Sequence, residues 1–136
     1  MQDIILNKTD SLSEYLTDSI KIIHDFLAMK SVIQISSQIE KDNEKHGTEK
    51  VIDICQKLNA DTYYNAVGGQ SLYSFSEFKK KGIVLKFLKT KPIQYKQYGD
   101  KFIPNLSIID VMMFNSGERI KEYLYDYDLI EENREK

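Results

Sequence analysis

Short apolar runs alternate with helix-like segments along this chain, and that alternation limits its possible folds more than any other sequence feature. Residues 83–88 are almost continuously apolar, which is typical of a strand buried on both faces. A β-branched run at 32–35 and a run at 62–64 precede it, and residues 93–97 alternate like an edge or returning strand. Because helix-like segments separate the first three runs, the sequence predicts parallel strands joined by helical crossovers.

The helix-like segments carry apolar residues at three- and four-residue spacing and end at typical stop residues. Ser11 and Glu14 form a capping box ahead of the longest of them. Asn59 and Gly82 are the expected stops of the second and third. The predicted helices cover residues 12–28, 47–58, 75–78 and 108–114, with a last helix near Ile120 and Leu124 and a frayed tail at 131–136.

These elements predict an α/β fold: a small three-layer sandwich with a short, mostly parallel sheet and C-terminal helices. At 136 residues the chain can bury one core but not two comfortable ones, so a single domain over residues 1–136 is expected. A sheet of three or four short strands leaves an exposed edge unless another chain or segment covers it. The narrow sheet therefore suggests a partner surface.

Charge and cysteine content argue against several classes of function. The formal net charge of −2, from 19 basic and 21 acidic residues, gives no positive field of the kind that holds nucleic acid. The single cysteine, Cys55, excludes an internal disulfide framework and favours a reducing cytoplasm. No run approaches the ~20 apolar residues of a membrane span. We therefore expect a cytoplasmic protein whose partners include neither nucleic acid nor a membrane.

Two loops are candidates for ligand binding, because ligands of open parallel sheets collect beyond the carboxyl ends of the strands. Ser36 and Ser37 follow the first predicted strand, and Asn65, Gly68 and Gly69 follow the second. The glycines would let backbone N–H groups approach a phosphate or a sugar hydroxyl, and the asparagine amide would bind hydroxyls. A pair of glycines after a strand is also common in simple turns, so that alternative stays open.

A second candidate segment is richer in polar and aromatic groups than packing requires. It contains Tyr95 and Gln97, followed by Ser107 and Asp110 at the start of a predicted helix. The alternative is structural, because a hydroxyl at N-cap and a carboxylate at N3 would satisfy free N–H groups of that helix.

The sequence assigns no catalytic residue, metal ligand or cofactor. The motifs G-x-G-x-x-G, G-x-x-x-x-G-K-[ST], H-E-x-x-H and G-x-S-x-G are absent. His24 is expected on the polar side of the first helix and His46 in a charged loop. Cys55 lies among apolar helix positions, where a buried and inert thiol is expected. None of the three forms a catalytic pair.

Two ordered blocks of the sequence carry a resemblance to a known family. The first is Asn65-Ala66-x-Gly68-Gly69 with its flanking residues, from Ile54-Cys55 to Gly82-Ile83-x-Leu85-x-Phe87. The second is Tyr95-x-Gln97 with Phe102-x-Pro104-x-Leu106-Ser107-Ile108-Ile109-Asp110-x-x-x-Phe114-Asn115. In order and spacing the chain resembles the WbqC-like family of bacteria from about residue 12 to residue 130.

The resemblance implies a role in O-antigen or related surface polysaccharide synthesis. It suggests the sugar-nucleotide-binding part of a transferase that moves an acyl or aminoacyl group, with a nucleotide-linked sugar or similar small molecule as ligand. Family members typically begin with a strand and an H-Q-P-x-Y-x-P stretch that these residues do not contain, so the chain is expected to be the C-terminal portion. The alternatives are a non-catalytic interaction module, pairing with itself or with a complementing N-terminal segment, and a truncated, inactive family member.

Overall fold

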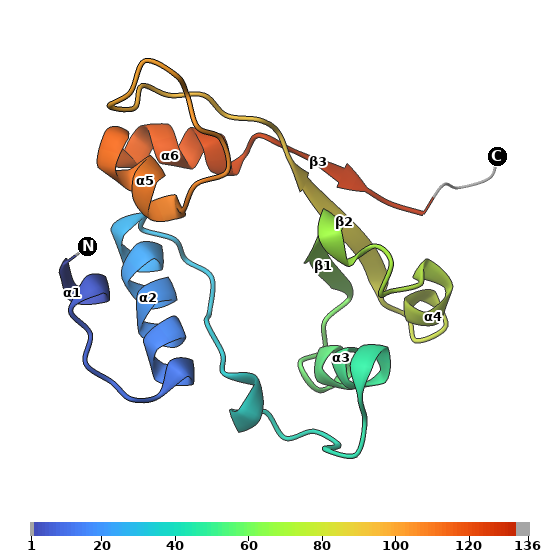
Figure 1. Ribbon diagram of the computed structural model, residues 1–136. Coiled ribbons are helices and arrows are strands. Elements are labelled where there is room, and N and C mark those ends of the chain that lie inside the picture. Colours follow the sequence, from blue (N-terminus) through green and yellow to red (C-terminus); the bar gives the residue numbers. More distant parts are fainter. Residues whose placement is uncertain (1, 133–136) are drawn as a thin grey trace. The chain divides into compact units, whose positions relative to one another are not determined.

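The computed structural model describes residues 2–132 and divides into two compact units. One unit comprises Met1–Ile33 and Pro92–Asp126, and we call it the helical unit. The other comprises Gln34–Lys91 and Tyr127–Lys136, and we call it the sheet unit. Figure 1 shows the elements of both units. A single domain over residues 1–136 stays a prediction.

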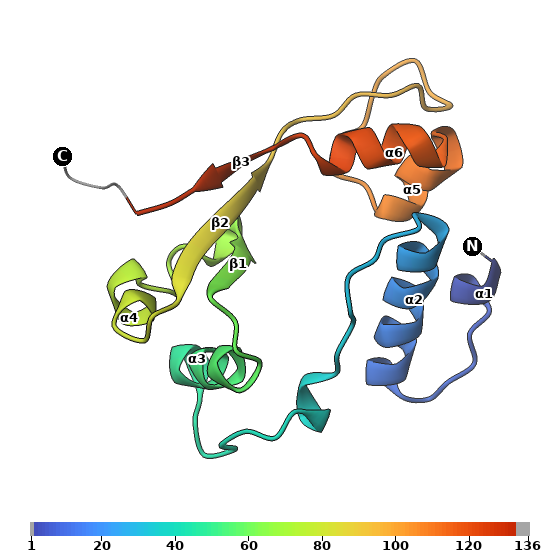
Figure 2. The same ribbon diagram turned by 180° about the vertical axis from the view of Figure 1, so that it is seen from behind.

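The described residues of the sheet unit, 34–91 and 127–132, form three strands in the order β1-β2-β3 (Figures 1 and 2). β1 pairs with β2 in parallel, and β2 pairs with β3 antiparallel. The predicted α/β class is confirmed, but the sheet is mixed rather than mostly parallel. The elements of this unit are the 3-10 helix η1 (Ser36–Gln38), α3 (Gly47–Lys57), β1 (Thr62–Ala66), the 3-10 helix η2 (Val67–Gly69), α4 (Phe75–Lys79), β2 (Val84–Thr90) and β3 (Tyr127–Ile130).

One face of the sheet buries the core of this unit. Leu85 and Phe87 alternate toward that face from β2, as the two-residue period of a strand requires. Phe78 of α4 is fully buried, and its ring stacks on Tyr63 of β1 at a centroid distance of 5.4 Å. Cys55 brings α3 into the same cluster, so both helices pack on this face of the sheet.

The helical unit has its own, smaller core, formed by Leu27, Val111 and Ile120. Its elements are α1 (Gln2–Ile5), α2 (Leu12–Phe26), α5 (Ile108–Phe114) and α6 (Gly117–Leu124). The N-cap predicted for the first long helix is confirmed, since the Ser11 hydroxyl accepts from the Glu14 N–H at 3.3 Å. The helices predicted near the C-terminus correspond to α5 and α6.

Two predicted strands are wrong. Residues 32–35 form no strand; Val32 is 84% exposed, and Ile35 serves as the N-cap of η1. A β-branched run favours an extended backbone but supplies no partner for its hydrogen bonds. Residues 93–97 also form no strand. At the end of this segment the side chain of Gln97, and not its main chain, pairs with the backbone of Ile103.

The strand β3 was not predicted, because the only element expected in this part of the chain was the helix near Ile120 and Leu124. That helix ends at Leu124, and Tyr127 pairs with Thr90 of β2. Polar residues interrupt the strand, so its sequence lacks a clear apolar alternation. The stops predicted at Asn59 and Gly82 are confirmed by positive φ angles of 51° and 75°. Of the predicted frayed tail, residues 133–136 lie outside the described residues.

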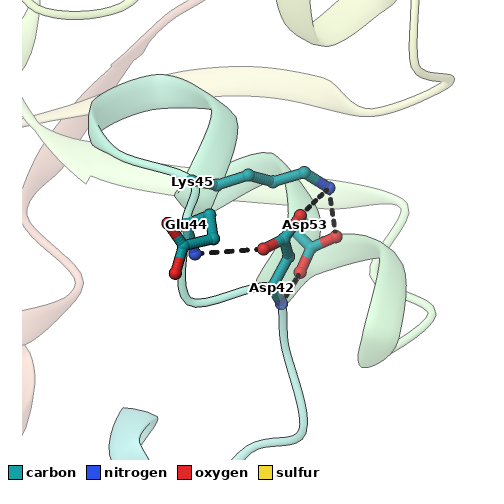
Figure 3. A network of polar contacts seen from close by, with 4 residues as sticks. All are labelled: Asp42, Glu44, Lys45 and Asp53. Atoms are coloured by element: carbon teal, nitrogen blue, oxygen red, sulfur yellow. Dashed lines mark hydrogen bonds and ion pairs between the residues drawn. The ribbon is translucent and has the colours of Figure 1, made fainter.

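A buried carboxylate fixes the loop that leads into α3 (Figure 3). Asp53 is 6% exposed, and its Oδ1 accepts from the Lys45 ammonium at 2.8 Å while its Oδ2 accepts from the Asp42 N–H at 3.0 Å. Asp42 in turn accepts from the Glu44 N–H at 3.0 Å. The Lys45 bond first, and the Asp42 N–H second, lower the pKa of Asp53 below its ordinary value. Both carboxylate oxygens are engaged, so Asp53 acts here as a structural anchor.

Replacing Asp53 by Asn should destabilise the protein more at pH 7 than at pH 3. A carboxyl whose folded pKa is lowered contributes stability above its ordinary value of 3.8, and that contribution disappears as the pH falls through the lowered pKa. Thermal unfolding of wild type and Asp53→Asn at pH 7 and at pH 3 measures the difference. Exposed Asp61→Asn is the matched control and should leave the melting temperature unchanged. A gap between wild type and Asp53→Asn that is equal at both pH values would contradict this role.

Candidate functional site

Three of the residues singled out from the sequence meet in one hydrogen-bonded network in the helical unit. The Tyr95 hydroxyl donates to Oδ2 of Asp110 at 2.6 Å. The Gln97 amide nitrogen donates to the same oxygen at 2.9 Å. Both bonds end on one carboxylate oxygen of Asp110, and neither reaches Oδ1. We call Tyr95, Gln97 and Asp110 the carboxylate network.

Gln97 bonds to groups of the protein through both ends of its side-chain amide. Its two amide hydrogens go to Asp110 and, at 3.1 Å, to the carbonyl of Ile103. Its amide oxygen accepts from the Ile103 N–H at 2.8 Å. The side chain thus pairs with the backbone of Ile103 in both directions and closes the loop between them. Gln97 is therefore a positioning residue for Asp110 and the loop.

Tyr95 remains protonated in this arrangement. Burial first, and then the hydrogen bond to Asp110, raise the pKa of Tyr95 above its ordinary value. Its single proton is used on Asp110, so the hydroxyl can only accept from a further group. A neutral donor next to a carboxylate holds the carboxylate in one orientation.

Ser107 places Asp110 by capping the helix that carries it. The Ser107 hydroxyl accepts from the Ile109 N–H at 3.2 Å, so the structural reading of Ser107 as an N-cap is confirmed. Asp110 does not bond to the first turn of α5 in the way that the structural alternative predicted. The hydrogen bonds to its carboxylate come from Tyr95 and Gln97.

The turn after β1 forms a second arrangement, in the sheet unit. The Asn65 amide nitrogen donates to the Tyr63 hydroxyl at 3.0 Å. Burial first, with the neighbouring Tyr73 hydroxyl second, raises the pKa of Tyr63 to about 12, so Tyr63 stays a neutral donor and acceptor. Gly69 approaches the Asn65 amide so closely that an added Cβ would lie 3.1 Å from its oxygen. Gly68 has open space around it.

Ser36 and Ser37 do not occupy the position predicted for them. No strand precedes them, so the argument from the carboxyl end of a parallel sheet does not apply. Both are exposed and lie in η1, where the Ser36 carbonyl accepts from the Lys41 ammonium. The ribbon places η1 on the connection that leads from α2 toward α3.

The remaining reactive residues form no catalytic group. His24 contacts the neighbouring Asp25 at 3.2 Å, and His46 is the N-cap residue of α3 without a side-chain hydrogen bond. Cys55 is buried, and burial raises the pKa of its thiol, which opposes thiolate chemistry. Among residues 2–132, no cluster of three or more histidine, cysteine or carboxylate side chains is arranged to hold a metal ion. No helix in that range has the length and apolar character needed to cross a membrane.

The model of the WbqC-like protein family matches residues 1–122. The chain belongs to the WbqC-like family. No curated protein and no solved structure matches this WbqC-like chain. The matched residues include both the carboxylate network and the turn after β1.

Sequence reasoning missed how these WbqC-like residues are connected. Tyr63 was assigned to a strand, yet its hydroxyl accepts from the Asn65 amide and has the Tyr73 hydroxyl as a neighbour. The signal available was the Y-x-N spacing, which places Tyr63 and Asn65 on one face of a strand. The bond between Gln97 and Ile103 left no signal, since no local pattern encodes a side chain that pairs with a backbone six residues away.

Replacing Gly69 by Ala should disturb the turn, whereas replacing Gly68 by Ala should not. The added methyl group at 69 would crowd the Asn65 amide, and overpacking of this kind costs about 1–3 kcal/mol. The methyl group at 68 meets nothing within 4 Å, so its effect should stay within about 0.5 kcal/mol. Urea unfolding gives both free energies, and the side-chain amide resonances of Asn65 report the local change. Equal effects of the two substitutions would show that Gly69 is not packed against Asn65.

Proposed function

We propose that this WbqC-like protein acts in bacterial surface polysaccharide (O-antigen) synthesis, where it binds a nucleotide-linked sugar or a similar small molecule. In this proposal it is the substrate-binding part of an acyl- or aminoacyl-type transferase. Family membership supports the pathway. The observation that supports binding is the carboxylate network, in which one oxygen of Asp110 is fixed and the other is left for a ligand.

The chemistry of Asp110 suits the sugar end of such a ligand. A carboxylate held by two donors on Oδ2 keeps acceptor capacity on Oδ1 for a hydroxyl or amino group. Hydrogen bonds to a charged group are about twice as strong as those between neutral groups. A carboxylate repels a pyrophosphate, so the nucleotide phosphates would lie away from Asp110.

The turn after β1 is the second proposed binding element. Asn65, Gly68 and Gly69 follow a strand that pairs in parallel with β2, and ligands commonly collect at the carboxyl ends of such strands. Gly68 has no neighbour that a side chain would meet, so its backbone is open to approach. Ser36 and Ser37 lack this placement and are not part of the proposal.

Asp110→Asn should weaken binding of nucleotide-linked sugars by about 10- to 150-fold, the range expected for a lost hydrogen bond to a charged group of about 1.5–3 kcal/mol. The amide keeps the size of the carboxylate but loses its charge. Isothermal titration of wild type with a panel of nucleotide-linked sugars identifies the ligand, and the variant is then titrated with it.

Asp100→Asn, an exposed carboxylate in the same loop, is the control and should bind like wild type. Circular dichroism of each variant shows whether the fold is kept. Absence of heat from every nucleotide-linked sugar with wild-type protein would overturn the proposed function.

A second candidate function, a non-catalytic interaction module, is favoured by the surface of α2. Leu12, Leu16 and Ile20 recur every four residues and are 72%, 50% and 55% exposed. Leu27 lies on the same stripe and is buried in the core of the helical unit. The uncovered half of the stripe is apolar and carries no charge, so a second copy of the chain can pack on it without repulsion.

Under this second candidate, light scattering should find a dimer that Leu16→Glu converts to a monomer. The introduced carboxylate would be buried without a partner at the interface. Leu72→Glu, at a 69% exposed leucine of the sheet unit, should leave the mass unchanged. A wild-type protein that stays monomeric at all concentrations would exclude the α2 stripe as a self-association surface.

A further inference from the structure

Aromatic rings gather around the carboxylate network within the helical unit. Phe114 follows Asp110 by one turn of α5, so both project from the same side of the helix, about 5–6 Å apart between their Cβ atoms. Tyr98 meets Phe114 edge to face at a centroid distance of 5.0 Å. Phe102 meets Tyr95 in the same way at 5.2 Å, and Tyr95 and Phe114 lie 6.4 Å apart.

The outermost of these rings is almost completely exposed. Tyr98 is 95% exposed, although its ring touches Phe114. Ile103, Leu106 and Met113, from the same loop and helix, are 57%, 48% and 62% exposed. Figure 1 shows this loop in gold to orange, running past α6 and turning back to α5. An apolar surface of several neighbouring residues beside a charged group often marks a binding site.

We propose that Tyr98 and Asp110 form the subsite for the pyranose ring of the ligand. The inference rests on the proposed function and names the part of the ligand that binds here. The apolar face of a pyranose lies on the Tyr98 ring, and a hydroxyl or amino group of its rim donates to Oδ1 of Asp110. Phe114 supports the Tyr98 ring from the side.

A pyranose fits these groups better than the other parts of a nucleotide-linked sugar. An aromatic face carries partial negative charge and attracts the C–H groups of one side of a sugar ring. The rim of the sugar carries the donors that Asp110 lacks. A phosphate has no donor at neutral pH and would be repelled by the carboxylate.

Side-chain contacts hold the loop that carries Tyr98. Gln97, next to Tyr98, pairs with the backbone of Ile103 through both ends of its amide. Phe102 is held against Tyr95. These contacts restrict the loop, and a restricted site loses less conformational entropy when a ligand binds.

Chemical-shift mapping by NMR tests the subsite on the complete chain. Wild type is titrated with a nucleotide-linked hexose, with the nucleoside diphosphate that lacks the sugar, and with the methyl glycoside of the same hexose. The backbone resonances of Tyr98, Asp110 and Phe114 should shift with the nucleotide-linked hexose and with the methyl glycoside, and not with the nucleoside diphosphate.

Two substitutions of Tyr98 distinguish the contribution of its aromatic ring from that of its hydroxyl group. Tyr98→Ala should weaken the nucleotide-linked hexose at least tenfold, and Tyr98→Phe should keep wild-type affinity because only the ring is needed. Tyr125→Ala removes an 82% exposed tyrosine at the end of α6 and should have no effect.

The outcomes distinguish this inference from the proposed function. Tight binding of the nucleotide-linked hexose with shifts elsewhere, unchanged in Tyr98→Ala, would overturn the pyranose subsite and leave the proposed function intact. Shifts at Tyr98 with the nucleoside diphosphate alone would assign the ring to the base and also overturn the inference. Binding of the methyl glycoside at Tyr98 without any affinity for nucleotide-linked sugars would support the subsite and overturn the proposed function. No binding by any of the three would overturn both.

Discussion

The parallel register between β1 and β2 is the constraint on which the sheet unit depends. Parallel strands cannot be joined by a tight hairpin, so the chain must cross back over the sheet between Ala66 and Val84. That crossover contains η2 and α4, and Phe78 of α4 fills the space over β1 and β2. The close contact between Gly69 and Asn65 lies at the start of the same crossover, where the chain leaves β1. The turn and the core are thus consequences of one pairing.

The helical unit orders its long loop by a different means. Between β2 and α5 there is no strand, although the sequence of residues 93–97 alternates. The side-chain amide of Gln97 accepts from the Ile103 N–H, a bond that a neighbouring strand would otherwise provide. The same amide donates to Asp110 of α5. Tyr95 adds a neutral donor to the same carboxylate oxygen. The carboxylate of Asp110 thereby connects α5 with Tyr95 and Gln97 of the preceding segment through hydrogen bonds.

The sequence predicted best those elements whose signals are local. The N-cap at Ser11, the stops at Asn59 and Gly82 and the apolar strand β2 all follow from neighbouring residues, and the structure confirms them. The predicted strand at 32–35 is wrong because β propensity describes a preference for an extended backbone, whereas a strand also needs a partner. The strand β3 was missed for the opposite reason: its pairing with β2, almost forty residues earlier in the chain, compensates for a weak local pattern.

In the candidate site, too, the sequence indicated which residues matter but not which hydrogen bonds join them. An excess of polar and aromatic groups over packing needs drew attention to Tyr95, Gln97 and Asp110, and the structure joins them. Their connections could not be read from the sequence, since the Gln97 amide bonds to both Asp110 and the backbone of Ile103. The bonds from Tyr95 and Gln97 both end on the same carboxylate oxygen of Asp110. A side chain whose amide donors are both used within the protein positions its neighbours, as Gln97 does for Asp110 and the loop. Oδ1 of Asp110 accepts neither of these bonds, and for that reason the proposed ligand contact is assigned to Asp110 and not to Gln97.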